Sequence, residues 1–274
     1  MSIKSQITEK LLLLVLDGCR YDTAVEQMGI LNHHVDYKQA QLIKVHAEMP
    51  SSSRPLYEVL ATGVPSYRNG ILTNADGQHS KELSIFDLVK AAGGSTAAAA
   101  HYWQSELFNQ APYEIKRDRI QHDHKKSIQH GIFYSENQYP DSHVFVDGHY
   151  LLHTYQPNLL LIHPMNIDAA GHRYTAVSKE YRKAVNQADQ LIGLYLHDWL
   201  AAGYQVIVTA DHGMDEYGLH GGSMAAHREV PLYIFSDIFP PDCGIEKMNQ
   251  LELAPLICSL LKIDTSERMQ IGRS

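Results

Sequence analysis

Cysteine is scarce in this chain, and so are long apolar runs and positive charge. Only three cysteines occur among 274 residues, Cys19, Cys243 and Cys258. Such an odd, unpatterned set provides neither a disulfide framework nor a cysteine-type zinc site. No apolar run approaches the roughly 20 residues needed to cross a bilayer, and residues 1–10 lack the basic-then-apolar order of a signal peptide. We therefore expect a cytoplasmic protein with no membrane partner.

The charge and composition exclude further classes. A formal net charge of −8 disfavours a nucleic-acid polymer as the main partner. A small anionic substrate is still allowed, because bound divalent cations reverse the local field. Hydrophobic residues make up 44% of the chain and charged residues 20%, which argues against a disordered or fibrous protein. The unusual number is 17 histidines, and it favours metal chemistry.

Apolar runs typical of buried strands alternate with helical patterns along the chain. The predicted strands cover residues 11–16, 95–100, 159–162, 206–209 and 230–235, and the predicted helices cover 54–62, 83–92, 178–202 and 251–261. This alternation predicts an α/β fold, a doubly wound and mostly parallel sheet with helices on both faces. The length fits a single catalytic domain, 1–274. A polar stretch within 101–150 predicts a small cap or surface excursion.

Three predicted strands run directly into side chains that bind metals. These candidate ligands are Asp17 after the first strand, Asp168 and His172 after the strand at 159–162, and Asp211 and His212 after the strand at 206–209. We expect the segment from Asp168 to His172 to be a loop that Gly171 allows to curl around one ion. Each pair alone is common in polar loops. Together they predict a metal-dependent site, because parallel strands end at the same edge of a sheet.

A nucleophile is available at the start of the predicted helix 54–62. Ser51, Ser52 and Ser53 precede it, and Ser53 would lie where free backbone N–H groups and the helix dipole favour an anion. A serine at this place is equally suited to capping the helix. The two roles are compatible. A hydroxyl beside a divalent cation becomes a much better nucleophile near neutral pH.

In order and spacing, these motifs resemble the nucleotide pyrophosphatase/phosphodiesterase branch of the alkaline phosphatase superfamily. The resemblance covers nearly the whole chain, from Asp17 to Pro231. In that branch the nucleophile stands ten residues before the glycine of a Thr-Gly pair, which matches Ser53 and Gly63. Asn74 matches an asparagine that contacts a nonbridging phosphoryl oxygen. The remaining family ligands match Asp17, Asp168, His172, Asp211, His212 and His220.

The resemblance implies two divalent metal ions, and we expect zinc. One ion would be held by Asp168, His172 and His220, and the other by Asp17, Asp211, His212 and the Ser53 oxygen. Mixed imidazole and carboxylate ligands suit zinc. The implied activity is hydrolysis of phosphoric diester or pyrophosphate bonds through a phosphoseryl intermediate. The substrate would be a small phosphorylated molecule such as a nucleotide.

Three residues leave alternatives open. Arg54 stands where the branch usually has an aromatic residue. It could pair with a second phosphate charge and favour monoesters, or be a solvated helix residue. Tyr102 could shape a specificity pocket or simply pack. His227 competes with His220 as the last ligand, and we favour His220 because its glycine-rich loop gives the backbone freedom.

Other functions also fit the pattern. A phosphomonoesterase, or another phosphoryl or phosphonate hydrolase of the superfamily, is the first alternative, and a catalytically silent metal-binding protein is the second. The segment from Ser51 to Pro55 lacks the spacing of a sulfatase nucleophile. The segment His220-Gly221-Gly222 also resembles phosphoethanolamine transferases of lipid glycan synthesis. The sequence does not indicate an oligomeric state.

Overall fold

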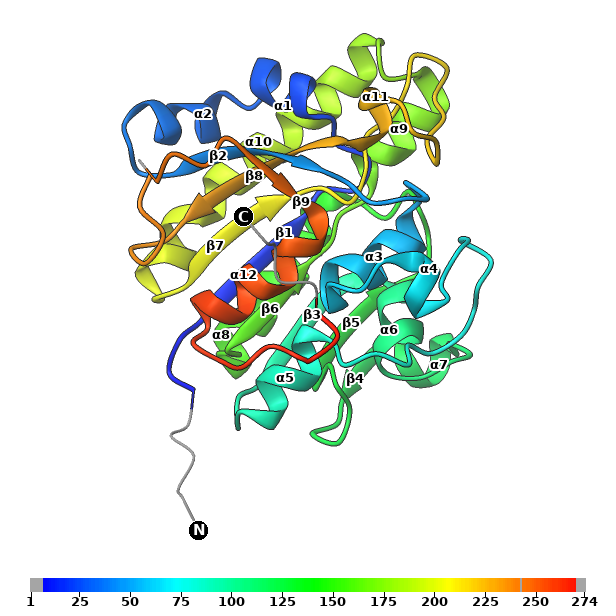
Figure 1. Cartoon of the computed structure of the whole chain (residues 1–274), viewed down its shortest axis with the longest axis vertical. Coiled ribbons are helices and arrows are strands. Elements are labelled where there is room, and N and C mark those ends of the chain that lie inside the picture. Colours follow the sequence, from blue (N-terminus) through cyan, green and yellow to red (C-terminus); the bar gives the residue numbers. More distant parts are fainter. Residues whose placement is uncertain (1–6, 242, 270–274) are drawn as a thin grey trace.

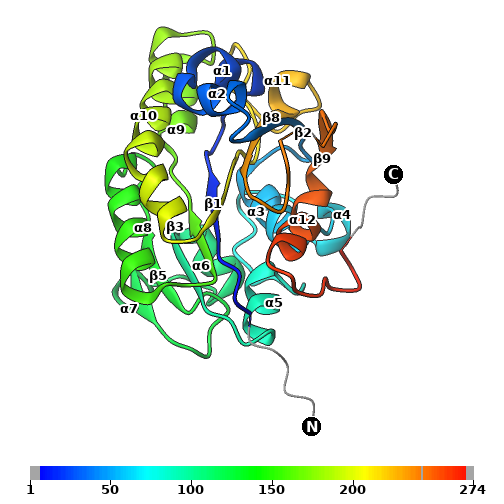
Figure 2. The ribbon, with the colours of Figure 1, turned by 90° about the vertical axis from the view of Figure 1, so that its left-hand side faces the viewer.

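One large sheet lies between two layers of helices (Figure 1, Figure 2). The computed structural model describes residues 7–241 and 243–269, and within them nine strands form a single sheet. From edge to edge the strands are β4 (Ile120–His122), β5 (His130–Tyr134), β3 (Thr96–His101), β6 (Leu159–Ile162), β1 (Leu11–Val15), β7 (Gln205–Thr209), β8 (Glu229–Phe235), β2 (Gln41–His46) and β9 (Lys247–Asn249).

The middle of the sheet is parallel. The pairs β5–β3, β3–β6, β6–β1 and β1–β7 are all parallel, while β8 runs antiparallel to β7 and β4 antiparallel to β5. The central strand β1 consists of Leu-Leu-Leu-Leu-Val and is buried throughout, as a strand covered on both faces requires. This confirms the predicted doubly wound, mostly parallel α/β fold.

Helices cover both faces of the sheet (Figure 2). One layer contains α1 (Tyr21–Gln27), α2 (Gly29–Asp36), α8 (Asp141–Tyr155), α9 (Asn166–Tyr174) and α10 (Lys179–Ala201). The other contains α3 (Ser53–Thr62), α5 (Ile85–Ala91) and α12 (Leu253–Leu260). The short helices are α4 (Ser66–Asn69), α6 (Tyr102–Phe108), α7 (Ile115–Asp118), α11 (Ala225–Arg228) and the 3-10 turn η1 (Gln250–Glu252). Among the described residues, no helix combines the length and apolarity needed to span a bilayer.

Local sequence explains how these helices begin and pack. Ser178 caps α10 by accepting from the Tyr181 N–H at 3.1 Å, as expected for serine before a helix. Gly148 lets α8 approach the sheet, because a Cβ there would lie 2.5 Å from Ile162 Cδ1. Larger residues at this position would force the helix away from β6.

The segment 101–150 differs from the prediction of a cap or surface excursion. It contains α6, α7, β4, β5 and most of α8, and both of its strands belong to the main sheet. Strand β5 pairs with β3 over His130 to Tyr134. Strand β5 is buried along most of its length, but it starts with His130 and Gly131 and follows a polar segment rich in histidine and lysine, so it lacks the apolar run of the central strands.

Candidate active site

The site is built where adjacent parallel strands end. Asp17 follows β1, His163 follows β6, and Asp211 with His212 follows β7. Because β6, β1 and β7 are neighbours and run in the same direction, their following residues share one edge of the sheet. Ligands of α/β proteins generally bind at this edge.

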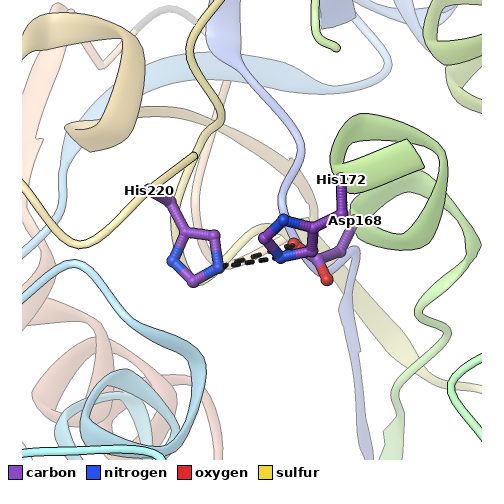
Figure 3. Close-up of side chains that lie close together, drawn as sticks. All are labelled: Asp168, His172 and His220. Atoms are coloured by element: carbon purple, nitrogen blue, oxygen red, sulfur yellow. Dashed lines mark hydrogen bonds and ion pairs between the residues drawn. The ribbon is translucent and has the colours of Figure 1, made fainter. Parts of the chain in front are cut away.

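Asp168, His172 and His220 come together and point toward one another (Figure 3). His172 Nε2 lies 3.4 Å from Asp168 Oδ1, and His220 Nε2 lies 3.8 Å from the same oxygen and 3.2 Å from His172 Nε2. The first two residues lie on helix α9, so the prediction of a loop here is wrong. Positions i and i+4 share one face of a helix, which brings carboxylate and imidazole together without a curled backbone.

Gly171 therefore has a different role from the one predicted. It lies inside α9, where a Cβ would be 2.8 Å from Met214 Cε and 2.9 Å from Met214 Cγ. Its missing side chain allows α9 to pack against the segment that follows β7. This contact fixes the helix carrying Asp168 relative to Asp211 and His212.

A second group forms around His212. Ligand atoms of Asp17, Asp168 and His212 lie within 4.8 Å of one another. His212 Nε2 is 3.6 Å from Asp17 Oδ1 and 3.3 Å from Asp211 Oδ2. Asp211 is oriented by the Gly18 N–H, which donates to its Oδ1 at 3.1 Å. The structure thus gathers the six candidate carboxylate and imidazole ligands into two adjoining groups, with Asp168 facing both.

Backbone carbonyls fix the orientation of the three histidines. In each ring Nδ1 contacts a carbonyl oxygen, which only accepts hydrogen bonds, so Nδ1 carries the proton. The pairs are His172 with Gly218 at 2.8 Å, His212 with Gly213 at 2.9 Å, and His220 with Ser51 at 3.0 Å. Each Nε2 then directs its lone pair at the carboxylates. Burial also lowers the pKa of His212, and it lowers the pKa of His220 to about 3.

The three carboxylates each have a buried oxygen without a partner. Among the described residues, Asp17 Oδ1, Asp168 Oδ1 and Asp211 Oδ2 have no hydrogen-bond donor. Burial and the neighbouring carboxylates raise the pKa of Asp168 and Asp211. Burial opposes ionisation of Asp17 too, but His163 and His212 together lower its pKa. Buried carboxylates facing imidazole lone pairs are costly unless a cation joins them, so this donor set fits divalent metal ions.

Ser53 lies beside this donor set at the start of α3. Its Oγ is 3.1 Å from His212 Nε2, and the residue is 3% exposed. Ser52 occupies the N-cap position, yet its side chain makes no capping bond. The Ser51 hydroxyl donates to the Gly222 carbonyl at 2.6 Å. Of the three serines, Ser53 thus has the position that a nucleophile requires.

Asn74 and Arg54 meet at the same helix end. The Arg54 N–H donates to Asn74 Oδ1 at 3.0 Å, which ties Asn74 to the start of α3 across 20 residues. The Arg54 side chain is not solvated, because the residue is 2% exposed and its guanidinium pairs with Glu106. Tyr102 packs with its ring centroid 5.0 Å from that of Tyr113. Substrate binding by Arg54 and Tyr102 stays a prediction.

Two residues of the site escaped the sequence analysis. The Tyr57 hydroxyl donates to Asp17 Oδ2, and His163 Nε2 lies 3.3 Å from the same oxygen. Both residues are almost completely buried. Both side chains contact Oδ2 of Asp17, and Oδ1 of Asp17 faces His212. His163 had a usable signal, because it directly follows the strand 159–162, as the other candidates follow their strands.

His227 does not join the cluster. It is buried, accepts from the Gly222 N–H at 3.0 Å and lies 3.1 Å from Asp215 Oδ2 through Nε2. Asp215 in turn accepts from the N–H groups of Tyr217 and Leu219. His227 and Asp215 thereby hold the loop that presents His220.

A protein-family model described as type I phosphodiesterase/nucleotide pyrophosphatase matches residues 11–224. The chain belongs to this family. Among curated relatives, GPI ethanolamine phosphate transferase 3 of Schizosaccharomyces pombe is 23% identical over 282 residues, covering 93% of this chain and 28% of the relative. Human ectonucleotide pyrophosphatase/phosphodiesterase family member 7 is 34% identical over 76 residues, covering 26% and 16%. The chain spans less than a third of the length of these relatives.

Solved structures share the fold of this family member. Murine ectonucleotide pyrophosphatase/phosphodiesterase 5 matches with a TM-score of 0.75 and 14% identity, covering 94% of this chain and 96% of that one. An inactive variant of the mouse protein in complex with AMP matches with a TM-score of 0.72 and 15% identity, with the same coverage. A 2-O GAG sulfatase matches with a TM-score of 0.67 and 11% identity, covering 97% and 73%.

Proposed function

We propose that this protein is a two-metal phosphodiesterase or nucleotide pyrophosphatase that works through a phosphoseryl intermediate on Ser53. One observation carries the proposal. The Ser53 hydroxyl lies at the N-terminus of α3, 3.1 Å from His212 Nε2, beside buried carboxylate oxygens that lack partners. A small nucleotide-like substrate is proposed because the mouse relative was solved with AMP.

The proposed metal ligands follow the two groups. Asp168, His172 and His220 would hold one ion, and Asp17, Asp211, His212 and the Ser53 oxygen the other. Zinc is proposed because these are imidazole and carboxylate donors, without any cysteine. Bound ions would stabilise negative charge on phosphoryl oxygens and lower the pKa of nearby hydroxyl groups.

The protein's own residues would divide the reaction into two steps. The Ser53 oxygen forms a bond to phosphorus while the bond from phosphorus to the leaving oxygen breaks. The Ser53 N–H would stabilise charge on a nonbridging oxygen. The next backbone groups of α3 are not available for this, because Arg54 donates to Asn74, Pro55 has no N–H and Leu56 donates to the Ser52 carbonyl. Asn74 assists through its amide N–H, since its Oδ1 already accepts from Arg54. Water then cleaves the phosphoserine, and the Ser53 hydroxyl is restored.

Transfer to another hydroxyl is the second candidate function. One curated relative favours this function. The match covers 93% of this chain, and the relative is named GPI ethanolamine phosphate transferase 3. Such an enzyme would share the first step and replace water by an acceptor alcohol in the second. The cytoplasmic location, and the lack of membrane and nucleic-acid partners, stay predictions from the sequence.

Hydrolysis of bis-p-nitrophenyl phosphate by zinc-loaded protein tests the proposal. We expect turnover by the natural chain, and a loss of roughly 10³-fold or more in Ser53→Ala, because a missing nucleophile removes the covalent route. Ser52→Ala is the matched control, since its hydroxyl makes no capping bond, and should change the rate by less than about threefold. Unchanged activity in Ser53→Ala would overturn the assignment. An alcohol added as acceptor would reveal transfer, if phosphorylated alcohol forms at the expense of hydrolysis.

A further inference from the structure

The residue that follows the proposed nucleophile carries a charge that is already matched inside the protein. Arg54 is 2% exposed and Glu106 is 8% exposed, and the guanidinium donates to Glu106 Oε2. We propose that Glu106 sets the site's preference for singly charged phosphodiesters by neutralising Arg54. This inference rests on the proposed function and deepens it, because it assigns a substrate class to the same site.

The pair is held from several sides. Glu106 Oε1 accepts from the Tyr113 N–H at 2.9 Å, and the Arg54 guanidinium carbon lies 5.3 Å from the centre of the Trp103 ring. Turning Arg54 toward a substrate would leave a carboxylate buried and uncompensated, which is strongly unfavourable. The arginine is therefore fixed as half of an ion pair.

The pair also lies close enough to influence the reacting group. Arg54 adjoins Ser53 on α3, and its own N–H contacts Asn74. An unmatched charge at Arg54 would therefore act directly beside the proposed nucleophile.

Charge distinguishes the two substrate classes. A phosphate monoester carries between about 1.5 and 2 negative charges at neutral pH, whereas a diester carries one. A free arginine beside the nucleophile would favour the monoester, because guanidinium groups bind phosphate oxygens strongly. Glu106 removes that preference. From the sequence, Arg54 could have paired with a second phosphate charge. In the structure it pairs with Glu106, so this side of the site carries no net charge.

Two substitutions should move the preference in opposite directions. Glu106→Gln keeps the shape and frees the arginine charge, so kcat/KM for p-nitrophenyl phosphate relative to the bis ester should rise about tenfold. Arg54→Met leaves the Glu106 charge and should lower the same ratio by a similar factor. The double variant has no charge at either position, so its ratio of kcat/KM values should lie within about threefold of the natural ratio.

Binding gives a second readout that does not depend on turnover. In the Ser53→Ala background, Glu106→Gln should bind inorganic phosphate about tenfold more tightly by calorimetry, and Arg54→Met more weakly. If the natural protein hydrolyses neither ester, the proposed function fails, and phosphate binding still decides this inference. Unchanged ratios and unchanged phosphate affinity in folded single variants would overturn it and leave the pair a purely structural contact.

Discussion

At the scale of single residues, the candidate active site consists of carboxylate and imidazole side chains that are mostly buried. Asp17, Asp168 and Asp211 are each at most 5% exposed. Their unpartnered oxygens would weaken the fold if nothing joined them. The Tyr57 hydroxyl and the nearby His163 ring both face the same oxygen of Asp17, Oδ2. Residues that hydrogen-bond to a metal ligand typically change metal affinity by about 10 to 100-fold when they are replaced.

Tyr57→Phe tests this orientation. The change removes the hydroxyl that donates to Asp17 Oδ2 and should weaken zinc binding by roughly 10 to 100-fold, measured by competition with a chromophoric chelator. Tyr204→Phe is the matched control, because its buried hydroxyl donates to the Pro157 carbonyl at 2.7 Å, outside the donor set. Equal zinc affinity in both variants would show that the Tyr57 hydroxyl does not orient Asp17.

Glu58 predicts a pH dependence of stability. Burial raises its pKa to about 8, although Ser80 donates to it. A carboxyl with a raised folded-state pKa stabilises the fold below its ordinary pKa of 4.5, and this stabilisation is lost as the pH rises through about 8. Glu58→Gln should therefore be more stable than the natural protein at pH 9 by up to about 5 kcal/mol, and nearly equal at pH 5. Urea unfolding at the two pH values measures the difference. A stability gap that does not widen with pH would contradict the prediction.

The sequence predicts some residues of the candidate site and misses others. Proposed ligands such as Asp211 and His212 carry a local signal, since they follow an apolar strand. Tyr57 and Glu106 do not, because they act on partners 40 and 52 positions away. No local pattern encodes which carboxylate a buried tyrosine will face. The pairing of Arg54 is visible only once α3 and α6 lie together.

At the scale of elements, the least expected feature is that Asp168 and His172 belong to a helix. Their spacing fits a helix, but the glycine at 171 and the adjoining strand suggested a loop. The structure shows that Gly171 serves packing against Met214. Strands such as β6 and β7 were predicted closely, because continuous burial gives long apolar runs. The short helices α1 and α2 were not predicted.

Gly171→Ala tests the packing of α9. Alanine favours a helix by about 1 kcal/mol over glycine, but its Cβ would meet Met214 Cγ at 2.9 Å. Overpacking typically costs about 1–3 kcal/mol, so we expect net destabilisation and weaker zinc binding by His172 and Asp168. The double variant with Met214→Ala should recover part of the zinc affinity. A stabilised Gly171→Ala protein with full zinc affinity would contradict this account.

At the scale of the whole molecule, the ligands unite segments from all parts of the chain. The proposed ligands come from the segments that follow β1 and β7, from α3 and α9, and from the loop at His220. A ligand that binds only the folded state stabilises it by mass action. Zinc at 100 times its dissociation constant should therefore add about 2.7 kcal/mol per site, seen as a higher Tm in calorimetry. Elemental analysis should find two ions per chain, and fewer than two after zinc loading would refute the two-metal proposal.

The position of β1 in the sheet has a consequence for how the chain acquires its structure. This strand, Leu11–Val15, pairs with β6 on one side and β7 on the other. Both partners are synthesised more than 140 residues later, at Leu159 and Gln205. A fully apolar segment must therefore stay unpaired during synthesis until the residues that lie between it and its partners have been made. The strand that positions Asp17 is thus also a segment exposed to misassociation in the nascent chain.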